Sequence, residues 1–152
     1  MDCHNTENRS LLQKIVILFT VLLSLEQLMA SVLIVDDEED IANPMRQYLI
    51  DGGFDAVSFT SPLLAFEHFR HNPYAYPIII TDLRMPGMNG IELANRIREI
   101  NGTVKIFMVT AFDTTDLESK PDYIRAKIEM IIQKPIKLSQ LRKIVEQFLQ
   151  TP

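Results

Sequence analysis

The sequence predicts an α/β protein built on a doubly wound parallel sheet of five strands. Three observations lead to this fold class. Short apolar segments alternate strictly with helical patterns over residues 31–150. The strongest of these segments are continuous β-branched runs, which are typical of strands buried on both faces. Four of them end in charged or hydroxyl residues, and the carboxyl ends of parallel strands meet at one edge of a sheet.

The first unit combines an apolar run at residues 32–35 with the acidic run Asp36-Asp37-Glu38-Glu39-Asp40. Acidic side chains suit the first turn of a helix because the helix dipole is positive there. The helical pattern continues to Leu49, and Gly52-Gly53 is a stop signal. Pro44 lies inside this pattern, and we expect it either to delay the helix start or to bend the first turns.

The second unit has a weaker strand pattern at residues 54–59. Ser61 followed by Pro62 predicts an N-cap and a first helical residue. The helix should run to about His71, because Asn72-Pro73 is a helix-breaking pair.

The central unit begins with Ile78-Ile79-Ile80-Thr81-Asp82, an apolar run that ends in a carboxylate. Pro86-Gly87 and Asn89-Gly90 follow as turn signals, and a helical pattern then extends to Ile100. Asp82 is therefore expected at the sheet edge where open α/β proteins bind ligands.

The last two units have apolar runs at residues 104–109 and 129–133. Thr110-Ala111 follows the first run and Lys134-Pro135 the second, and an amphipathic pattern from Lys137 predicts a final helix to about Gln150.

Residues 113–127, between these two units, are polar and contain Pro121. We expect only a short helix there, with Ser119 as its cap.

Composition excludes several classes of protein. The chain has 152 residues, which suits one domain with a real core. Its net charge of −5 gives no general affinity for nucleic-acid phosphates. Cys3 is the only cysteine, so an intrachain disulfide and a multi-cysteine metal site are excluded.

Residues 1–30 differ from the rest and form an N-terminal extension. Its apolar segment, residues 15–25, is shorter than the ~20 residues of a membrane span. The extension could be a mis-assigned upstream start, an uncleaved anchor or an added helix. We favour the first, with the natural chain starting at Met29. Membrane association through residues 11–28 is expected only if the extension belongs to the natural protein.

The residues at the strand ends predict a phosphoryl-transfer site. Asp36, Asp37 and Asp82 would repel one another strongly if brought together, so a cation is expected among them. Oxygen ligands with room for water favour Mg²⁺. Thr110 and Lys134 add a hydroxyl and an ammonium, which suit a dianionic phosphoryl group on an aspartate.

These residues resemble the motifs of the response-regulator receiver domain of two-component signalling. The resemblance covers about residues 31–150. It implies a flavodoxin-like sheet with strand order 2-1-3-4-5. The motifs that carry it are Val35-Asp36-Asp37-Glu38, the stretch from Asp82 to Gly90, Val109-Thr110-Ala111 and Lys134-Pro135.

The resemblance also implies roles around a metal ion. Asp82 would be the phosphoacceptor and a ligand of Mg²⁺. Asp37 would bind the ion directly, and Asp36 would act through water or a hydrogen bond. Arg84 stands where the family binds the ion through a backbone carbonyl, which implies nothing for its side chain.

Three further positions would face the phosphoryl group. Thr110 corresponds to the switch hydroxyl, and the backbone amide of Ala111 lies beside it. Lys134 corresponds to the lysine that pairs with a phosphoryl oxygen, and Lys134-Pro135 is a candidate cis peptide bond.

Two departures from the family pattern bear on signalling. Ile131 occupies the position where the family usually has an aromatic switch residue. Arg125-Ala126-Lys127-Ile128 replaces the usual Gly-Ala pair before the fifth strand, and Pro121 interrupts the preceding helix. The output face could therefore differ from that of relatives.

We expect a stand-alone cytoplasmic receiver that is not a turnover enzyme. A sensor histidine kinase or phosphotransfer protein would supply the phosphoryl group, and an unknown downstream protein, not nucleic acid, would receive the signal. Two alternatives stay open. Glu38, two residues after Asp36, permits a Mg²⁺-dependent phosphatase-like hydrolase. A receiver used as a constitutive binding scaffold is the other.

Overall fold

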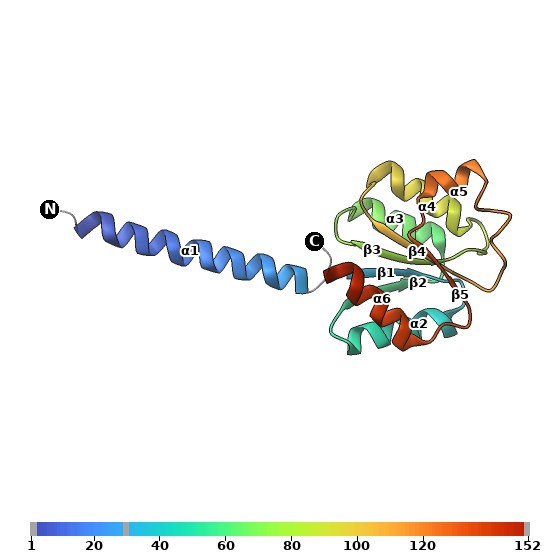
Figure 1. The fold of residues 1–152 in the computed structure, drawn as a ribbon, viewed down its shortest axis with the longest axis horizontal. Helices are drawn as coiled ribbons and strands as arrows, with labels where there is room; N and C mark the ends of the chain where they lie inside the picture. The colour runs from blue at the N-terminus through green and yellow to red at the C-terminus, as the bar shows by residue number, and fades with distance from the viewer. Residues whose placement is uncertain (1–2, 29–30, 151–152) are drawn as a thin grey trace.

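The computed structural model describes residues 3–28 and 31–150, and it contains the predicted sheet (Figure 1). The strand order is β2-β1-β3-β4-β5, and every neighbouring pair is parallel. This confirms the fold class and the strand order. The strands are β1 Ser31–Val35, β2 Asp55–Phe59, β3 Ile78–Asp82, β4 Lys105–Thr110 and β5 Met130–Gln133.

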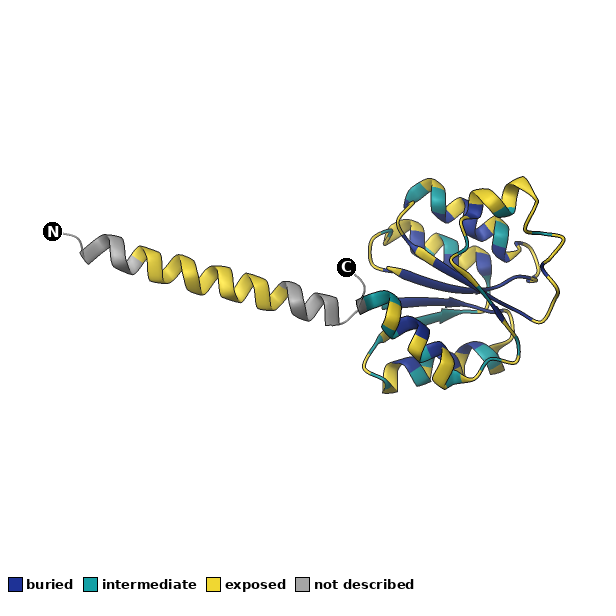
Figure 2. Ribbon diagram, viewed as in Figure 1, coloured by how far each residue is buried: buried dark blue, intermediate teal, exposed yellow. Residues whose placement is uncertain are grey.

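Helices cover both faces of the sheet, which makes three layers (Figure 1). On one face lie α2 (Glu39–Asp51) and α6 (Leu138–Gln150), and on the other lie α3 (Pro62–His71), α4 (Gly90–Ile100) and α5 (Pro121–Ala126). The central strands are buried on both sides, as their lack of polar alternation predicts (Figure 2).

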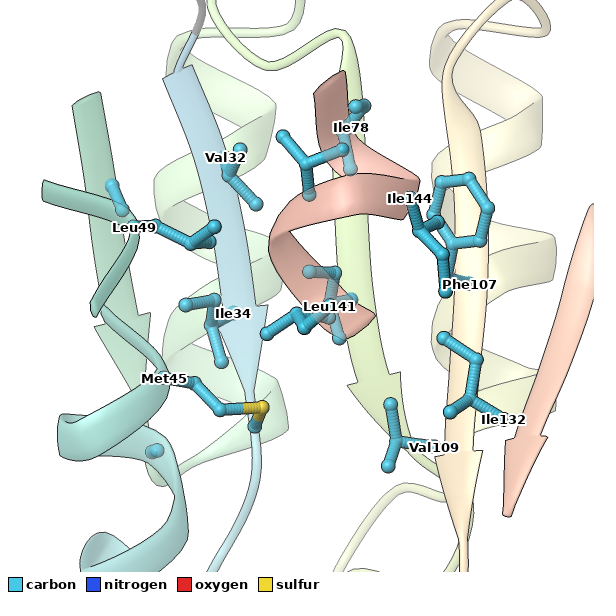
Figure 3. Close-up of a cluster of buried hydrophobic side chains, with 14 residues drawn as sticks. Val32, Ile34, Met45, Leu49, Ile78, Phe107, Val109, Ile132, Leu141 and Ile144 are labelled. Atoms are coloured by element: carbon cyan, nitrogen blue, oxygen red, sulfur yellow. The ribbon is translucent and has the colours of Figure 1, made fainter. Parts of the chain in front are cut away.

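Alternate residues of each central strand enter different cores. Ile34 packs toward α2 and α6, where Leu141 belongs to the same cluster (Figure 3). Ile80 of β3 belongs to this cluster too. Leu33 and Ile79 pack toward α3 and α4. The two cores fix the register of β1 and β3, because a shift of one residue would turn the side chains of each core toward the opposite face of the sheet.

The local helix signals are only partly confirmed. The Ser61 side chain accepts a hydrogen bond from the Leu64 amide, as expected of an N-cap. The prediction for Ser119 is wrong, because α5 begins at Pro121 with Lys120 as its N-cap. Proline at the first helical position sets the backbone angle itself. The start of α2 is not delayed: the helix begins at Glu39 and includes Pro44.

Before the sheet lies α1, Cys3–Leu28, which projects from the domain as a separate rod (Figure 1). Residues 8–22 are all exposed (Figure 2). Among the described residues, no helix is long and apolar enough to cross a membrane. The expected natural start at Met29 lies outside the described residues and stays a prediction.

Candidate functional site

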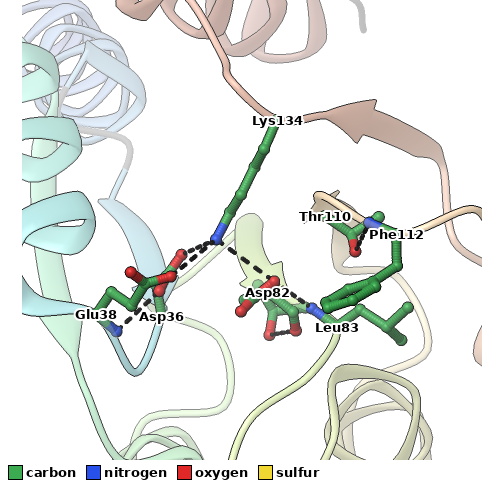
Figure 4. Close-up of polar contacts among 8 residues, drawn as sticks. Asp36, Glu38, Asp82, Leu83, Thr110, Phe112 and Lys134 are labelled. Atoms are coloured by element: carbon green, nitrogen blue, oxygen red, sulfur yellow. Dashed lines mark hydrogen bonds and ion pairs between the residues drawn. The ribbon is translucent and has the colours of Figure 1, made fainter.

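Four strands bring the predicted site residues to one edge of the sheet. Val35 is paired in register with Thr81, so Asp36 and Asp82 follow β1 and end β3 at the same height. Thr110 ends β4 opposite Gln133, and Lys134 is the next residue. Residues nearly a hundred positions apart in the chain therefore meet (Figure 4).

Asp36, Asp37 and Asp82 form the acidic cluster of this edge. One carboxylate oxygen from each residue lies within 4.8 Å of the others. Asp36 and Asp82 are buried, with 1% and 7% of their surface exposed, whereas Asp37 is exposed. The cluster therefore has an enclosed side within the protein and an open side toward solvent.

The Lys134 ammonium lies among these acids. Its Nζ donates a 2.9 Å hydrogen bond to Asp36 Oδ2 and lies 3.6 Å from Asp82 Oδ1 (Figure 4). Burial acts to lower the pKa of Lys134, but the hydrogen bond to Asp36 and the charges of Asp36, Asp82 and Glu38 raise it overall. Lys134 therefore stays charged and neutralises part of the cluster.

The surroundings of Asp82 disfavour its charge. Burial raises the pKa of Asp82, and the charges of Asp36 and Asp37 raise it further. Lys134 and the Leu83 amide, which donates a 2.8 Å hydrogen bond to Oδ1, act in the opposite direction. The net effect is a raised pKa, so an added cation would favour the ionised carboxylate.

The backbone after Asp82 is held by a close approach of α4. The Gly90 amide donates a 2.8 Å hydrogen bond to the Leu83 carbonyl. A Cβ atom at Gly90 would lie 2.2 Å from the Asp82 carbonyl oxygen. Only glycine fits at this first residue of α4, which explains the Asn89-Gly90 pair.

Thr110 is fully buried, and its Oγ1 accepts a 3.1 Å hydrogen bond from the Phe112 amide (Figure 4). Ala111 between them is exposed. Sequence reasoning missed Phe112, although an aromatic residue two positions after Thr110 was a possible signal. It also missed the Arg84 side chain, whose guanidinium carbon lies 3.8 Å from the centroid of the Phe112 ring.

The acidic cluster fits a hard divalent cation. Three carboxylates offer oxygen ligands, and the exposed Asp37 leaves room for water, as Mg²⁺ requires. The Arg84 backbone carbonyl is a further candidate ligand from the adjoining loop. The ligand roles expected from the sequence stay predictions.

A comparison with protein families identifies the family of this chain. The family model for the response regulator receiver domain matches residues 32–146. The chain belongs to this family. The matched region of the receiver domain begins within β1 and ends within α6, so it contains every residue of the predicted site.

The curated relatives that share this receiver domain differ in total length. It is 30% identical to the response regulator receiver protein CpdR of Brucella abortus, over 80% of this chain and 98% of CpdR. It is 33% identical to the regulatory protein VanRB of Enterococcus faecalis, and this match covers 78% of this chain and 51% of VanRB.

A third relative is named a cyclic di-GMP phosphodiesterase, from Thermotoga maritima. The identity is 33% over 74% of this chain, but the chain spans only 29% of that protein. The match therefore identifies a shared receiver domain.

Solved structures agree on the fold. The chemotaxis protein CheY4 of Vibrio cholerae has a TM-score of 0.71 at 23% identity, over 79% of this chain and 98% of that one. A response regulator receiver protein from Pseudomonas putida has a TM-score of 0.67 at 28% identity, over 78% of this chain and 97% of that one.

Proposed function

We propose that this receiver domain accepts a phosphoryl group on Asp82 from a histidine kinase or a phosphotransfer protein. The observation that carries the proposal is the buried Asp82 carboxylate beside the Lys134 ammonium, at 3.6 Å, within a cluster of three acids. The phosphorylated domain then signals through contacts with a downstream protein. Transfer from a cytoplasmic kinase implies a cytoplasmic protein.

In the transfer step, an Asp82 oxygen attacks phosphorus while the bond between phosphorus and the donor's histidine nitrogen breaks. The electron pair of that bond stays on the donor imidazole. Lys134 is positioned to pair with a phosphoryl oxygen, which would draw it away from Asp82 Oδ1. The Leu83 amide keeps the carboxylate oriented through its hydrogen bond to Oδ1.

The cation supplies charge neutralisation when bound. Asp36, Asp37 and Asp82 would hold Mg²⁺, which suits the negative charge of both the acids and the incoming group. In this structure Lys134 donates a 2.9 Å hydrogen bond to Asp36, which orients Asp36 toward the cluster.

A shallow apolar pocket beside the site suits docking of the donor. Its volume is about 430 Å³, and it lies between the first turns of α2 and the segment after β5. Ile41, Pro44 and Ile136 supply apolar lining, and Lys134 also lines the pocket. A donor helix bound there would bring its phosphohistidine to the open side of the cluster.

The geometry gives less support to the hydrolase alternative. That mechanism would use Asp36 as nucleophile and Glu38 as the second acid. Asp36 is instead engaged at both oxygens, by the Glu38 amide and by Lys134. The Glu38 side chain is 65% exposed and lies 4.0 Å from Lys134 Nζ. Asp82 is therefore the better-placed acceptor.

The test is incubation with acetyl phosphate and Mg²⁺, followed by intact-mass measurement. We expect one acid-labile phosphoryl adduct per chain, and its loss in Asp82→Asn with the fold intact. Asp116→Asn, at an exposed acid outside the cluster and outside the pocket, is the matched control and should be labelled like the wild type. Undiminished labelling of Asp82→Asn would exclude Asp82, and release of many phosphates per chain would favour the hydrolase.

A further inference from the structure

Phe112 connects the switch hydroxyl to the surface of the site. Its amide donates a 3.1 Å hydrogen bond to Thr110 Oγ1, and the Phe112 residue is 42% exposed. Thr110 itself is fully buried. To reach a phosphoryl oxygen on Asp82, the Thr110 side chain would rotate and give up the bond to Phe112.

Arg84 holds the Phe112 ring from the other loop. Its guanidinium carbon lies 3.8 Å from the ring centroid, within the range of a cation–π contact. Arg84 follows Asp82 by two positions, and Phe112 follows Thr110 by two. The pair therefore joins the loops that leave the phosphoacceptor strand β3 and the switch strand β4.

We propose that Phe112 is a positioning residue that keeps Thr110 in its resting orientation, with Arg84 as the clamp on Phe112. This inference rests on the proposed phosphorylation of Asp82. When Thr110 turns toward the phosphoryl group, the Phe112 amide in the loop after β4 loses its acceptor, Thr110 Oγ1, and the Arg84–Phe112 contact opens. The freed guanidinium is then attracted to the new dianion on the neighbouring strand end.

The Arg84–Phe112 pair matters because this chain has Ile131 where the family usually has an aromatic switch residue. Ile131 lies half-buried on the edge strand β5 and has no ring or hydroxyl to follow Thr110. Phe112 is an aromatic residue whose backbone amide donates a hydrogen bond to Thr110 Oγ1. The conformational signal should therefore emerge at the loops after β3 and β4, and weakly at Ile131.

The test is a titration of the full chain with beryllofluoride at saturating Mg²⁺, followed by NMR. The Leu83 amide reports binding at Asp82, and the Arg84 side-chain protons report the ring contact through their upfield ring-current shift. We expect both signals to change together, with Arg84 moving toward the positions of a free arginine.

Variants give a second measurement. An exposed cation–π contact corresponds to about a two- to five-fold change in an equilibrium constant. Phe112→Leu should therefore lower the beryllofluoride concentration at half-saturation by about that factor, and Phe112→Tyr should restore the wild-type value. Phe66→Leu removes the ring of another pair, with Arg96 at 5.7 Å, and should leave half-saturation unchanged.

The outcomes separate the two proposals. If the Leu83 amide responds but Arg84 does not move, or if Phe112→Leu binds no more tightly than the wild type, the clamp is wrong and the acceptor site stands. If no amide near Asp82 responds, the proposed function fails and the clamp fails with it.

Discussion

At the scale of single residues, the charge on Asp82 opposes folding in the absence of a cation. Folding raises its pKa from the ordinary value of 3.8, chiefly through burial. The folded protein then holds the proton at pH values where the unfolded chain has released it. This contribution to stability is complete below the ordinary pKa and is lost as the pH rises through the raised pKa.

Asp82→Asn should therefore be more stable than the wild type at pH 7 without Mg²⁺, by roughly 1 kcal/mol. Asparagine keeps the shape of the side chain without the charge. Urea unfolding of both proteins between pH 4 and pH 8 measures the effect. The advantage of the variant should grow as the pH rises, and a constant or shrinking advantage would contradict the assignment.

The site has no room for a side chain larger than that of Gly90. Gly90→Ala places a methyl group 2.2 Å from the Asp82 carbonyl oxygen, so the backbone after the phosphoacceptor must move. We expect a loss of about 2–3 kcal/mol in the free energy of unfolding, measured by urea denaturation. At Gly102 a Cβ meets no atom within 4 Å, so Gly102→Ala should stay within ~0.5 kcal/mol of the wild type. Equal losses in the two variants would refute the close approach.

At the scale of elements, α2 contains a proline that costs stability. Pro44 lies in the interior of the helix and has no amide to donate to the Asp40 carbonyl, whereas Pro62 occupies the first position of α3. Pro44 also lines the apolar pocket that we propose for donor docking.

Pro44→Ala should raise the free energy of unfolding by about 1–3 kcal/mol because it restores one helical hydrogen bond. Thermal unfolding followed by circular dichroism measures this. Pro62→Ala should shift stability in the opposite direction, because Pro62 is buried and already suits its position. A lower melting temperature for Pro44→Ala would show that the proline fits its site without strain.

At the scale of the whole molecule, the acidic cluster links metal binding to folding. A cation that binds only the folded state stabilises it by mass action, by about 2.7 kcal/mol at a hundred times its Kd. The chain also carries a net charge of −5, which favours divalent cations generally. A control acid outside the cluster is therefore needed.

We expect millimolar Mg²⁺ to raise the melting temperature of the wild type, with the ionic strength matched by NaCl. The rise should be clearly smaller in Asp37→Ala, which removes the exposed acid of the cluster. It should be unchanged in Asp116→Ala, an exposed acid on the loop after β4. An equal rise in all three proteins would place the ion elsewhere.

The sequence by itself determined the strands, their parallel arrangement and the acids at their ends. Continuous runs such as Ile78–Ile80 are apolar on both faces, and this local property requires a buried central strand. Once the strands are parallel, their carboxyl ends must share an edge. Asp36 and Asp82 end neighbouring strands of this edge, and the long Lys134 side chain reaches both carboxylates from the end of β5.

Only the tertiary structure decided where the short helix α5 begins and lies, and which contacts the loops make. Asn95 and Arg98, on α4, bond to the carbonyls of Asp122 and Ala126 and so fix where α5 lies, which no local capping signal reveals. The contact between Arg84 and Phe112 likewise joins loops that follow different strands. Such contacts depend on how separate elements pack, whereas local sequence encodes only the elements themselves.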